Sequence, residues 1–352
     1  MRHKFEQSLK IKDIIQDKSR FTALDGLRGI AVLAVVILHF GYPYSTYYPS
    51  DPLAPYSFVL GELGVQLFFV ISGFVILLSA STGGGAKNFV VSRFTRLYPT
   101  YWLALIFSSI LIFTVGIETR TITIPQVLVN LTMFQRFFLV DNVDQVYWTL
   151  AVEMQFYLLM LAFILASHGR LRKDYLLNFG VAWCSLGIFL MAMYPGDSAA
   201  GFAKIIVWLV LAQHAPFFCF GMAMFIFFHD RKFNIYIPFF GIVAIINTYL
   251  AHGVNHAVGV FLILTVFSIV VIFKKIKVLD SGPFQFLGKI SYSIYLFHTI
   301  TGFVIIHLTQ EFLGLWGSRF FAFVVVVFIS WISYQLVEIR FSKYLKNKLI
   351  SN

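Results

Sequence analysis

Three residues capable of ionic or acid–base chemistry lie in one apolar stretch near the start of the chain, LDGLRGIAVLAVVILHFGY. They are Asp25, Arg28 and His39. In an α-helix the step of 11 residues from Arg28 to His39 is almost three turns, so both side chains share one face, about 16 Å apart along the axis. Asp25 precedes Arg28 by one turn on that face. A charge inside a membrane helix costs about 2.5–3.5 kcal/mol, so this polar stripe is expected to face a protein interior or a watery cavity.

His39 and Glu153 are the two candidate catalytic residues. An imidazole can accept a proton near neutral pH, so His39 is predicted to act as a general base, and a plain helix-end histidine is the alternative. Glu153 lies in VYWTLAVEMQFYLLM, at a depth similar to that of His39. We predict that this carboxylate orients His39, and an interhelical hydrogen bond to a Tyr or Trp is the alternative.

Two arginines follow in VSRFTRLYPTYW, at the cytoplasmic mouth of an expected span. Arg93 and Arg96 are three residues apart, which places them on one helix face where they could bind a phosphate together. Ordinary anchoring at the cytoplasmic surface explains them equally well. Only these two arginines are predicted to hold phosphate, and Arg28 lies on the polar face of the first span that carries His39.

A further group of residues is predicted to line a cavity. The alternatives are close helix packing for Ser72, ordinary packing for His298 and membrane-interface anchoring for the Tyr and Trp residues. No metal site is expected, because the His252 and His256 pair is interrupted by a glycine and lacks a third ligand. The cavity candidates are Asp25, Ser72, Tyr147, Trp148, Tyr292 and His298.

The composition predicts an all-α, polytopic transmembrane helix bundle. Of 352 residues, 59% are hydrophobic and only 12% are charged, which is too apolar for a soluble fold of this length. Apolar runs long enough to span a bilayer number about ten, near residues 23–42, 57–80, 98–117, 145–167, 175–194, 203–228, 234–251, 257–273, 286–308 and 319–339.

The basic residues predict the topology. With ten spans and a cytoplasmic N-terminus, all but four of the 27 Lys and Arg residues fall on the cytoplasmic side, the four being Arg120, Arg136, Lys204 and Arg319. The net charge of +11 therefore reflects membrane topology and gives no support to nucleic-acid binding. We expect both termini in the cytoplasm, with a segment 1–20, a membrane domain 21–340 and a tail 341–352.

Five segments together resemble the acyltransferase 3 family of integral membrane proteins. They occur in the family's order and extend over about residues 20–340. The segments are LDGLRGIAVLAVVILHF with its Arg and His spacing, GVQLFFVISGFVI, VSRFTRLYPTYW, VYWTLAVEMQFYLL and LGKISYSIYLFH.

The resemblance implies an enzyme that moves an acyl group, most often acetyl, from cytoplasmic acyl-CoA to a hydroxyl of an extracytoplasmic carbohydrate such as an O-antigen, another lipopolysaccharide part or an exopolysaccharide. It makes His39 similar to the catalytic histidine, Arg28 to its conserved-spacing partner, Arg93 and Arg96 to the donor-side arginines, and Glu153 to the acid of the fourth-span motif. It implies acyl-CoA as a co-substrate with no permanently bound cofactor, the bacterial plasma (inner) membrane as location, and polysaccharide-assembly proteins as partners.

Two other functions suit a membrane bundle with a polar interior. One is a transporter or flippase of a lipid-linked sugar, although the chain lacks the two related halves typical of transporters. The other is a non-catalytic scaffold of a polysaccharide-assembly complex. For the enzyme, direct transfer assisted by His39 and an acyl intermediate on His39 both remain open.

Overall fold

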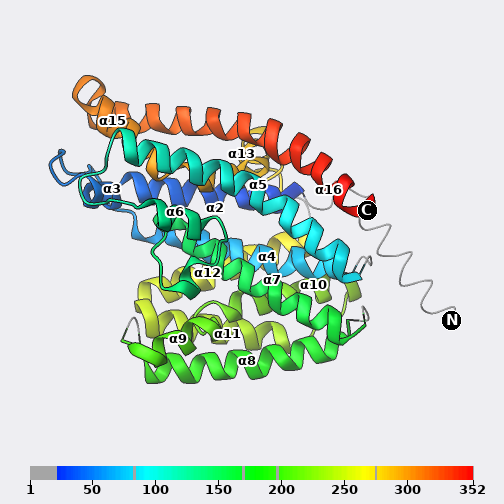
Figure 1. Ribbon diagram of the computed structural model, residues 1–352. Coiled ribbons are helices and arrows are strands. Elements are labelled where there is room, and N and C mark those ends of the chain that lie inside the picture. Colours follow the sequence, from blue (N-terminus) through cyan, green and yellow to red (C-terminus); the bar gives the residue numbers. More distant parts are fainter. Residues whose placement is uncertain (1–21, 82–84, 169–170, 196–197, 274–275, 352) are drawn as a thin grey trace. The chain divides into compact units, whose positions relative to one another are not determined.

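The described part of the chain is helical. The computed structural model describes residues 22–81, 85–168, 171–195, 198–273 and 276–351 (Figure 1). Within these ranges the chain forms helices and no strand, and an isolated bridge joins Ile117 to Arg120. The predicted all-α fold is therefore confirmed. The predicted cytoplasmic segment 1–20 lies outside the described residues.

Eight helical runs in the described chain are long and apolar enough to cross a membrane. This confirms the prediction of a polytopic helix bundle. The runs are Thr22–Phe40, Val59–Ala80, Gly85–Thr114, Gln145–Ala166, Lys173–Met193, Gly201–Asp230, Val254–Phe273 and Ile300–Ser351.

The structure differs from the expected ten runs at two places. The apolar helix Tyr236–His252 has 17 residues, which at 1.5 Å per residue is about 26 Å, shorter than a typical hydrocarbon core. The last run, Ile300–Ser351, holds two helices joined across a non-helical residue, Gly314, where φ is 69° and ψ is 178°. This break lies between the last two expected spans, 286–308 and 319–339, the first of which begins before Ile300. The count of ten and the cytoplasmic location of both termini remain predictions.

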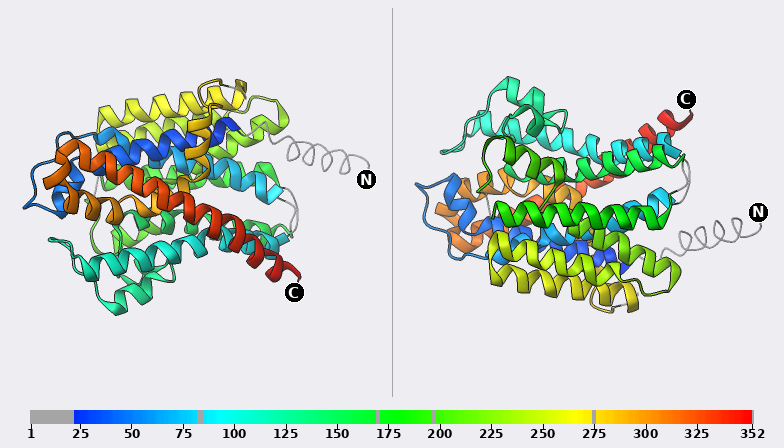
Figure 2. Two further views of the ribbon diagram at one scale, coloured as in Figure 1. Left: turned by 90° about the horizontal axis from the view of Figure 1, so that it is seen from above. Right: turned by 90° about the horizontal axis from the view of Figure 1, so that it is seen from below.

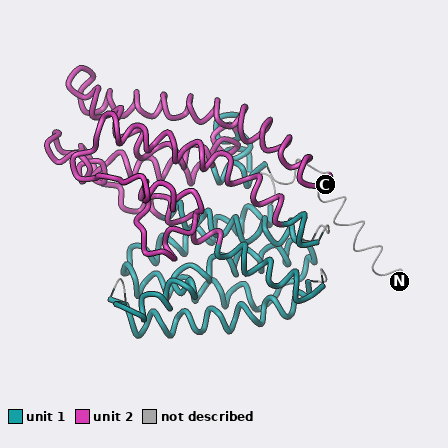
Figure 3. The backbone as a smooth tube through the Cα atoms, viewed as in Figure 1, with its two compact units in different colours: residues 1–28, 63–89, 155–285 teal, residues 29–62, 90–154, 286–352 magenta. Residues whose placement is uncertain are grey.

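The chain divides into two compact units, shown in different colours in Figure 3. Unit 1 comprises Met1–Arg28, Leu63–Phe89 and Gln155–Gln285. Unit 2 comprises Gly29–Glu62, Val90–Met154 and Phe286–Asn352. The units follow from packing, whereas the expected division into 1–20, 21–340 and 341–352 follows from topology and remains a prediction.

Unit 1 is built around the pair of helices α4 and α10, which lie side by side. Each helix contributes a glycine to the contact, Gly73 from α4 and Gly221 from α10. A Cβ atom on Gly73 would lie 2.2 Å from the Phe218 carbonyl oxygen. Gly73, directly after Ser72, thus allows the two backbones to approach closely. The helices that lie wholly in this unit are α4 (Leu63–Ser81), α8 (Lys173–Met193), α9 (Gly201–Val210), α10 (Ala215–Asp230), α11 (Tyr236–His252) and α12 (Val254–Phe273).

Unit 2 contains the residues from which the candidate site is built. Its C-terminal helices, from α15 to α16, are coloured orange to red in Figure 2. Several helices begin in one unit and end in the other or at its edge. The elements are α2 (Thr22–Phe40) from residue 29, α3 (Tyr42–Tyr47), η2 (Val59–Glu62), α5 (Gly85–Thr114) from residue 90, α6 (Ile124–Asn130), η3 (Gln135–Phe138), η4 (Gln145–Tyr147), the start of α7 (Trp148–Ala166), the end of α13 (Gly282–Lys289), α14 (Ser291–Phe297), α15 (Ile300–Ser333), η5 (Tyr334–Phe341) and α16 (Ser342–Ser351).

A buried arginine holds the end of α2 that carries His39. Arg319, 4% exposed, donates from Nε to the carbonyl oxygen of Phe40 at 2.8 Å and from Nη1 to that of Leu315 at 2.7 Å. The last carbonyls of a helix lack intrahelical donors and carry partial negative charge, so a guanidinium there is favourable. Gly302 on α15 lets the Phe40 ring approach, because a Cβ at that position would lie 2.5 Å from the ring.

Gly73→Ala tests the close contact inside unit 1. The added methyl group must displace the Phe218 backbone, so we expect the free energy of unfolding to fall by about 1–3 kcal/mol. The measurement is the midpoint of thermal unfolding in detergent. Gly282→Ala is the matched control, because a Cβ at Gly282 meets nothing within 4 Å. Equal midpoints for the two variants would show that the α4 and α10 contact tolerates a side chain.

Candidate active site

His39 and His298 form a pair of contacting imidazoles in unit 2. Nε2 of His298 lies 3.2 Å from Nδ1 of His39, and the ring centroids are 4.8 Å apart with the planes at 75°. His298 is fully buried, whereas His39 is partly exposed. His298, which was expected only to line a cavity, is therefore in direct contact with His39, the expected base.

The hydrogen-bond partners of the two rings determine which nitrogens carry protons. Nδ1 of His298 lies 2.8 Å from the carbonyl oxygen of Tyr295, which can only accept, so Nδ1 of His298 is protonated. In a neutral ring, Nε2 of His298 then accepts. Nδ1 of His39, 2.8 Å from the carbonyl oxygen of Val35, is likewise a donor and can share its proton with His298. Nε2 of neutral His39 keeps its lone pair, which is the arrangement a general base requires.

A buried carboxylate fixes the turn that follows His298. Asp144 has no exposed surface, and its Oδ2 accepts from the Thr299 hydroxyl and from the Ile300 N–H at 3.5 Å. Its Oδ1 accepts from the Val146 N–H at 3.3 Å. An acidic group at the first N–H groups of α15 is favoured by the helix dipole. Asp144 thus joins the start of α15 to the start of η4.

Asp144 was not singled out in the sequence. It immediately precedes an expected span, where an acidic residue usually faces water. Its position before the Gln145–Tyr147 helix is typical of an N-cap, and this signal alone could have indicated an inward-pointing carboxylate.

Glu153 lies near the same network on α7. One turn earlier, the Thr149 hydroxyl donates to the Tyr295 hydroxyl at 2.9 Å, and Glu153 interacts electrostatically with Tyr295. Tyr295 is the residue whose carbonyl oxygen holds His298. Glu153 is therefore placed beside the support of the histidine pair, and its predicted action on His39 remains a prediction.

The aromatic candidates take different positions in unit 2. Tyr147 is fully buried and packs edge-on against Tyr101, with ring centroids 5.1 Å apart. Trp148 begins α7 and is half-buried. The Tyr292 hydroxyl donates to the carbonyl oxygen of Leu97 at 2.9 Å, which links α14 to α5. Their predicted lining of a cavity remains a prediction.

Arg93 and Arg96 lie on α5 in unequal environments. Arg93 is 8% exposed and donates from Nη2 to the Ser92 hydroxyl at 3.3 Å, whereas Arg96 is exposed. Arg96 interacts electrostatically with Glu338, whose Oε1 accepts from the Ser293 hydroxyl at 2.6 Å. The helix α14 that precedes His298 is therefore linked through Glu338 to the basic segment of α5.

Asp25, Arg28 and Ser72 belong to unit 1. Nη1 of Arg28 lies 3.1 Å from Oδ1 of Asp25, so the shared helix face expected for this pair is confirmed. Ser72 is half-buried on α4. The participation of these three residues in a site with His39 remains a prediction.

The apolar helices define a multi-pass membrane protein. The chain belongs to the acyltransferase 3 family, whose model, described as an acyltransferase domain, matches residues 21–335. Family membership identifies it as a membrane acyltransferase.

Two distant relatives match most of the chain, and a third matches a shorter part of it. "Putative acetyltransferase ORF330" of Acidianus two-tailed virus is 25% identical over 88% of this chain and 90% of its own length. "Putative O-acetyltransferase SACOL0978" of Staphylococcus aureus strain COL is 26% identical over 91% of this chain, which spans only 57% of that protein. "Protein 2 in picA locus" of Rhizobium radiobacter is 39% identical over 24% of this chain and 42% of its own length. No solved structure matches the chain.

Asp144→Asn tests the buried carboxylate. The amide replaces one accepting oxygen by a donor, so either Val146 or the Thr299 and Ile300 pair loses its acceptor. We expect a loss of about 1–3 kcal/mol in the free energy of unfolding, measured from thermal or denaturant midpoints in detergent. Asp141→Asn, three residues away on an exposed loop position, is the matched control and should change little. A midpoint for Asp144→Asn equal to that of Asp141→Asn would contradict the anchoring role.

Proposed function

We propose that the protein transfers an acyl group, in the first instance acetyl, from cytoplasmic acyl-CoA to a hydroxyl of an extracytoplasmic saccharide at the plasma (inner) membrane. Acyl-CoA is then a co-substrate, and no cofactor is permanently bound. The family and the relatives named as O-acetyltransferases support acyl transfer to oxygen. The predicted topology, which places Arg93 and Arg96 inside, supports a cytoplasmic donor.

The observation that carries the proposal is the pair of contacts that Nδ1 of His39 makes with Val35 and His298. Its Nδ1 is occupied by Val35 and His298, so Nε2 is the nitrogen available to accept a proton. Because Nδ1 has these two partners, the ring is held in one orientation. A histidine that only packs would not need a second buried imidazole at hydrogen-bond distance.

In the proposed reaction, Nε2 of His39 removes the proton from the saccharide hydroxyl as its oxygen attacks the thioester carbonyl. The carbon–sulfur bond breaks, an ester forms, and the departing CoA thiolate receives the proton from His39. His298 keeps the protonated imidazole oriented. The runner-up route places the acyl group on His39 before the saccharide attacks, and acyl-His39 trapped without acceptor would support it.

Arg93 and Arg96 are proposed to bind the phosphates of CoA. Guanidinium groups are well suited to phosphate because their N–H donors match its oxygens. CoA carries its thioester at the tip of a long uncharged arm, so phosphates held on α5 leave the thioester free to reach His39. Arg28, on α2, is predicted to bind the acyl-CoA donor along the path of this arm.

His39→Ala tests the base. We expect acyl transfer from labelled acetyl-CoA by purified protein in vesicles to fall by about 10²–10⁴-fold, because general-base assistance is lost. His298→Asn should lower kcat less than His39→Ala and leave the KM for acetyl-CoA unchanged. His252→Asn, at an exposed position in unit 1, is the control. Unaltered turnover by His39→Ala would remove the catalytic assignment.

Arg96→Glu tests the donor site. Charge reversal at an exposed phosphate-binding arginine should raise the KM for acetyl-CoA at least about tenfold and leave the KM for the saccharide unchanged. Lys346→Glu is the matched control, because it makes the same charge change at an exposed position on α16. If both variants behave alike, Arg96 serves only as a topological anchor.

A further inference from the structure

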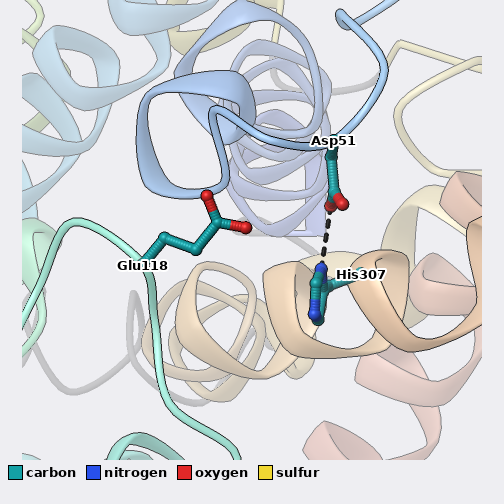
Figure 4. Close-up of side chains that lie close together, drawn as sticks. All are labelled: Asp51, Glu118 and His307. Carbon is teal, nitrogen blue, oxygen red and sulfur yellow. Dashed lines mark hydrogen bonds and ion pairs between the residues drawn. The ribbon is translucent and has the colours of Figure 1, made fainter.

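Three potential metal ligands converge in unit 2, away from the histidine pair. Asp51 follows α3, Glu118 follows α5 and His307 lies on α15. Their ligand atoms all lie within 4.8 Å of one another (Figure 4). Oδ2 of Asp51 is 2.9 Å from Nδ1 of His307, and the Glu118 carboxylate points toward this pair across a short gap.

Both carboxylates are oriented by neighbouring groups. Glu118 accepts from the Ser50 N–H at 3.1 Å and from the Ser50 hydroxyl. Asp51 accepts from the Tyr44 hydroxyl. Supporting hydrogen bonds of this kind orient ligands in metal sites.

The imidazole of His307 is also held in place. It stacks on the Tyr48 ring, with centroids 4.2 Å apart and planes at 9°. The Tyr48 hydroxyl donates to the carbonyl oxygen of Gly116 at 2.8 Å, two residues before Glu118. The two loops and α15 are therefore joined around the three ligand atoms, and little rearrangement is needed to bring them onto one ion.

A buried amide provides an independent sign of a missing partner. Gln310, 6% exposed, follows His307 by three residues and so shares its face of α15. Its Nε2 donates to the Tyr44 hydroxyl at 3.2 Å, beside Asp51, and its Oε1 has no hydrogen-bond partner in the described part of the chain. A buried carbonyl oxygen without a donor is costly, and a bound cation or its water would satisfy it.

We propose that Asp51, Glu118 and His307 bind one divalent cation of the zinc class, with Gln310 Oε1 contributing directly or through a water molecule. One imidazole nitrogen and two carboxylate oxygens are donors that Zn²⁺ accepts, whereas Ca²⁺ and Mg²⁺ prefer oxygen ligands alone. Glu118 is exposed, so the ion can enter from solvent. The bound ion would clamp both loops to α15.

The test is calorimetric titration of chelator-treated protein with Zn²⁺ alone, in detergent and without a polyhistidine tag. His252 and His256 lie with ring centroids 5.3 Å apart and offer a competing pair, so both are replaced by Asn in every sample. We expect one Zn²⁺ per chain and no competition from Ca²⁺. X-ray absorption of the bound Zn²⁺ should show one imidazole and no sulfur.

Glu118→Gln and His307→Gln should each weaken Zn²⁺ binding by at least about tenfold. Asp141→Asn, also exposed and acidic, should leave it unchanged. Because Glu118 is on the surface, its variant keeps the fold, which thermal unfolding without Zn²⁺ checks. Absence of binding at micromolar Zn²⁺, or binding undiminished in both variants, overturns the proposal and leaves the cluster as a hydrogen-bonded clamp.

Discussion

The hydrogen bond between Nδ1 of His298 and the carbonyl oxygen of Tyr295 determines the chemistry of the candidate site. A carbonyl oxygen can only accept, so this bond fixes the proton on one nitrogen of His298 and makes the other an acceptor. In His39, Nδ1 likewise carries the proton, because it faces the carbonyl oxygen of Val35 and the accepting Nε2 of His298. Two backbone oxygens thereby decide which nitrogen of His39 can accept a proton.

Polar groups in the interior of unit 2 are used to hold helix ends. Asp144 accepts from the first N–H group of α15, and Arg319 donates to the last carbonyl group of α2. Uncompensated charges in an apolar interior are expensive, so each is placed where a helix terminus offers the opposite partial charge. These two anchors hold the ends of the helices that bring His39 and His298 together.

The polar connections of unit 2 extend on both sides of the histidine pair. Toward α5, Ser293 and Glu338 connect α14 to the segment that contains Arg96. At the beginning of α7, Thr149 bonds the Tyr295 hydroxyl, and Glu153 lies one turn further along the helix. The loops near Asp51 and Glu118 form a separate hydrogen-bonded group with α15. In hydrocarbon such groups must find partners within the protein, which explains why they occur as connected sets.

The sequence by itself determined the helical class and most of the apolar spans, because apolar run length and helical periodicity are local properties. It also predicted His39 as the candidate base, which remains a prediction. The apolar runs also predicted the helix Tyr236–His252, expected near residues 234–251, and a break where Gly314 lies, between the expected spans 286–308 and 319–339. The pairing of His39 with His298 was decided by tertiary structure, since residues so far apart in the chain meet only when helices pack. For the same reason the sequence did not predict the burial of Asp144. Whether a residue at the boundary of a span is buried depends on which helix terminus packs over it. Periodicity tells which face of a helix a residue occupies, and only packing tells what that face meets.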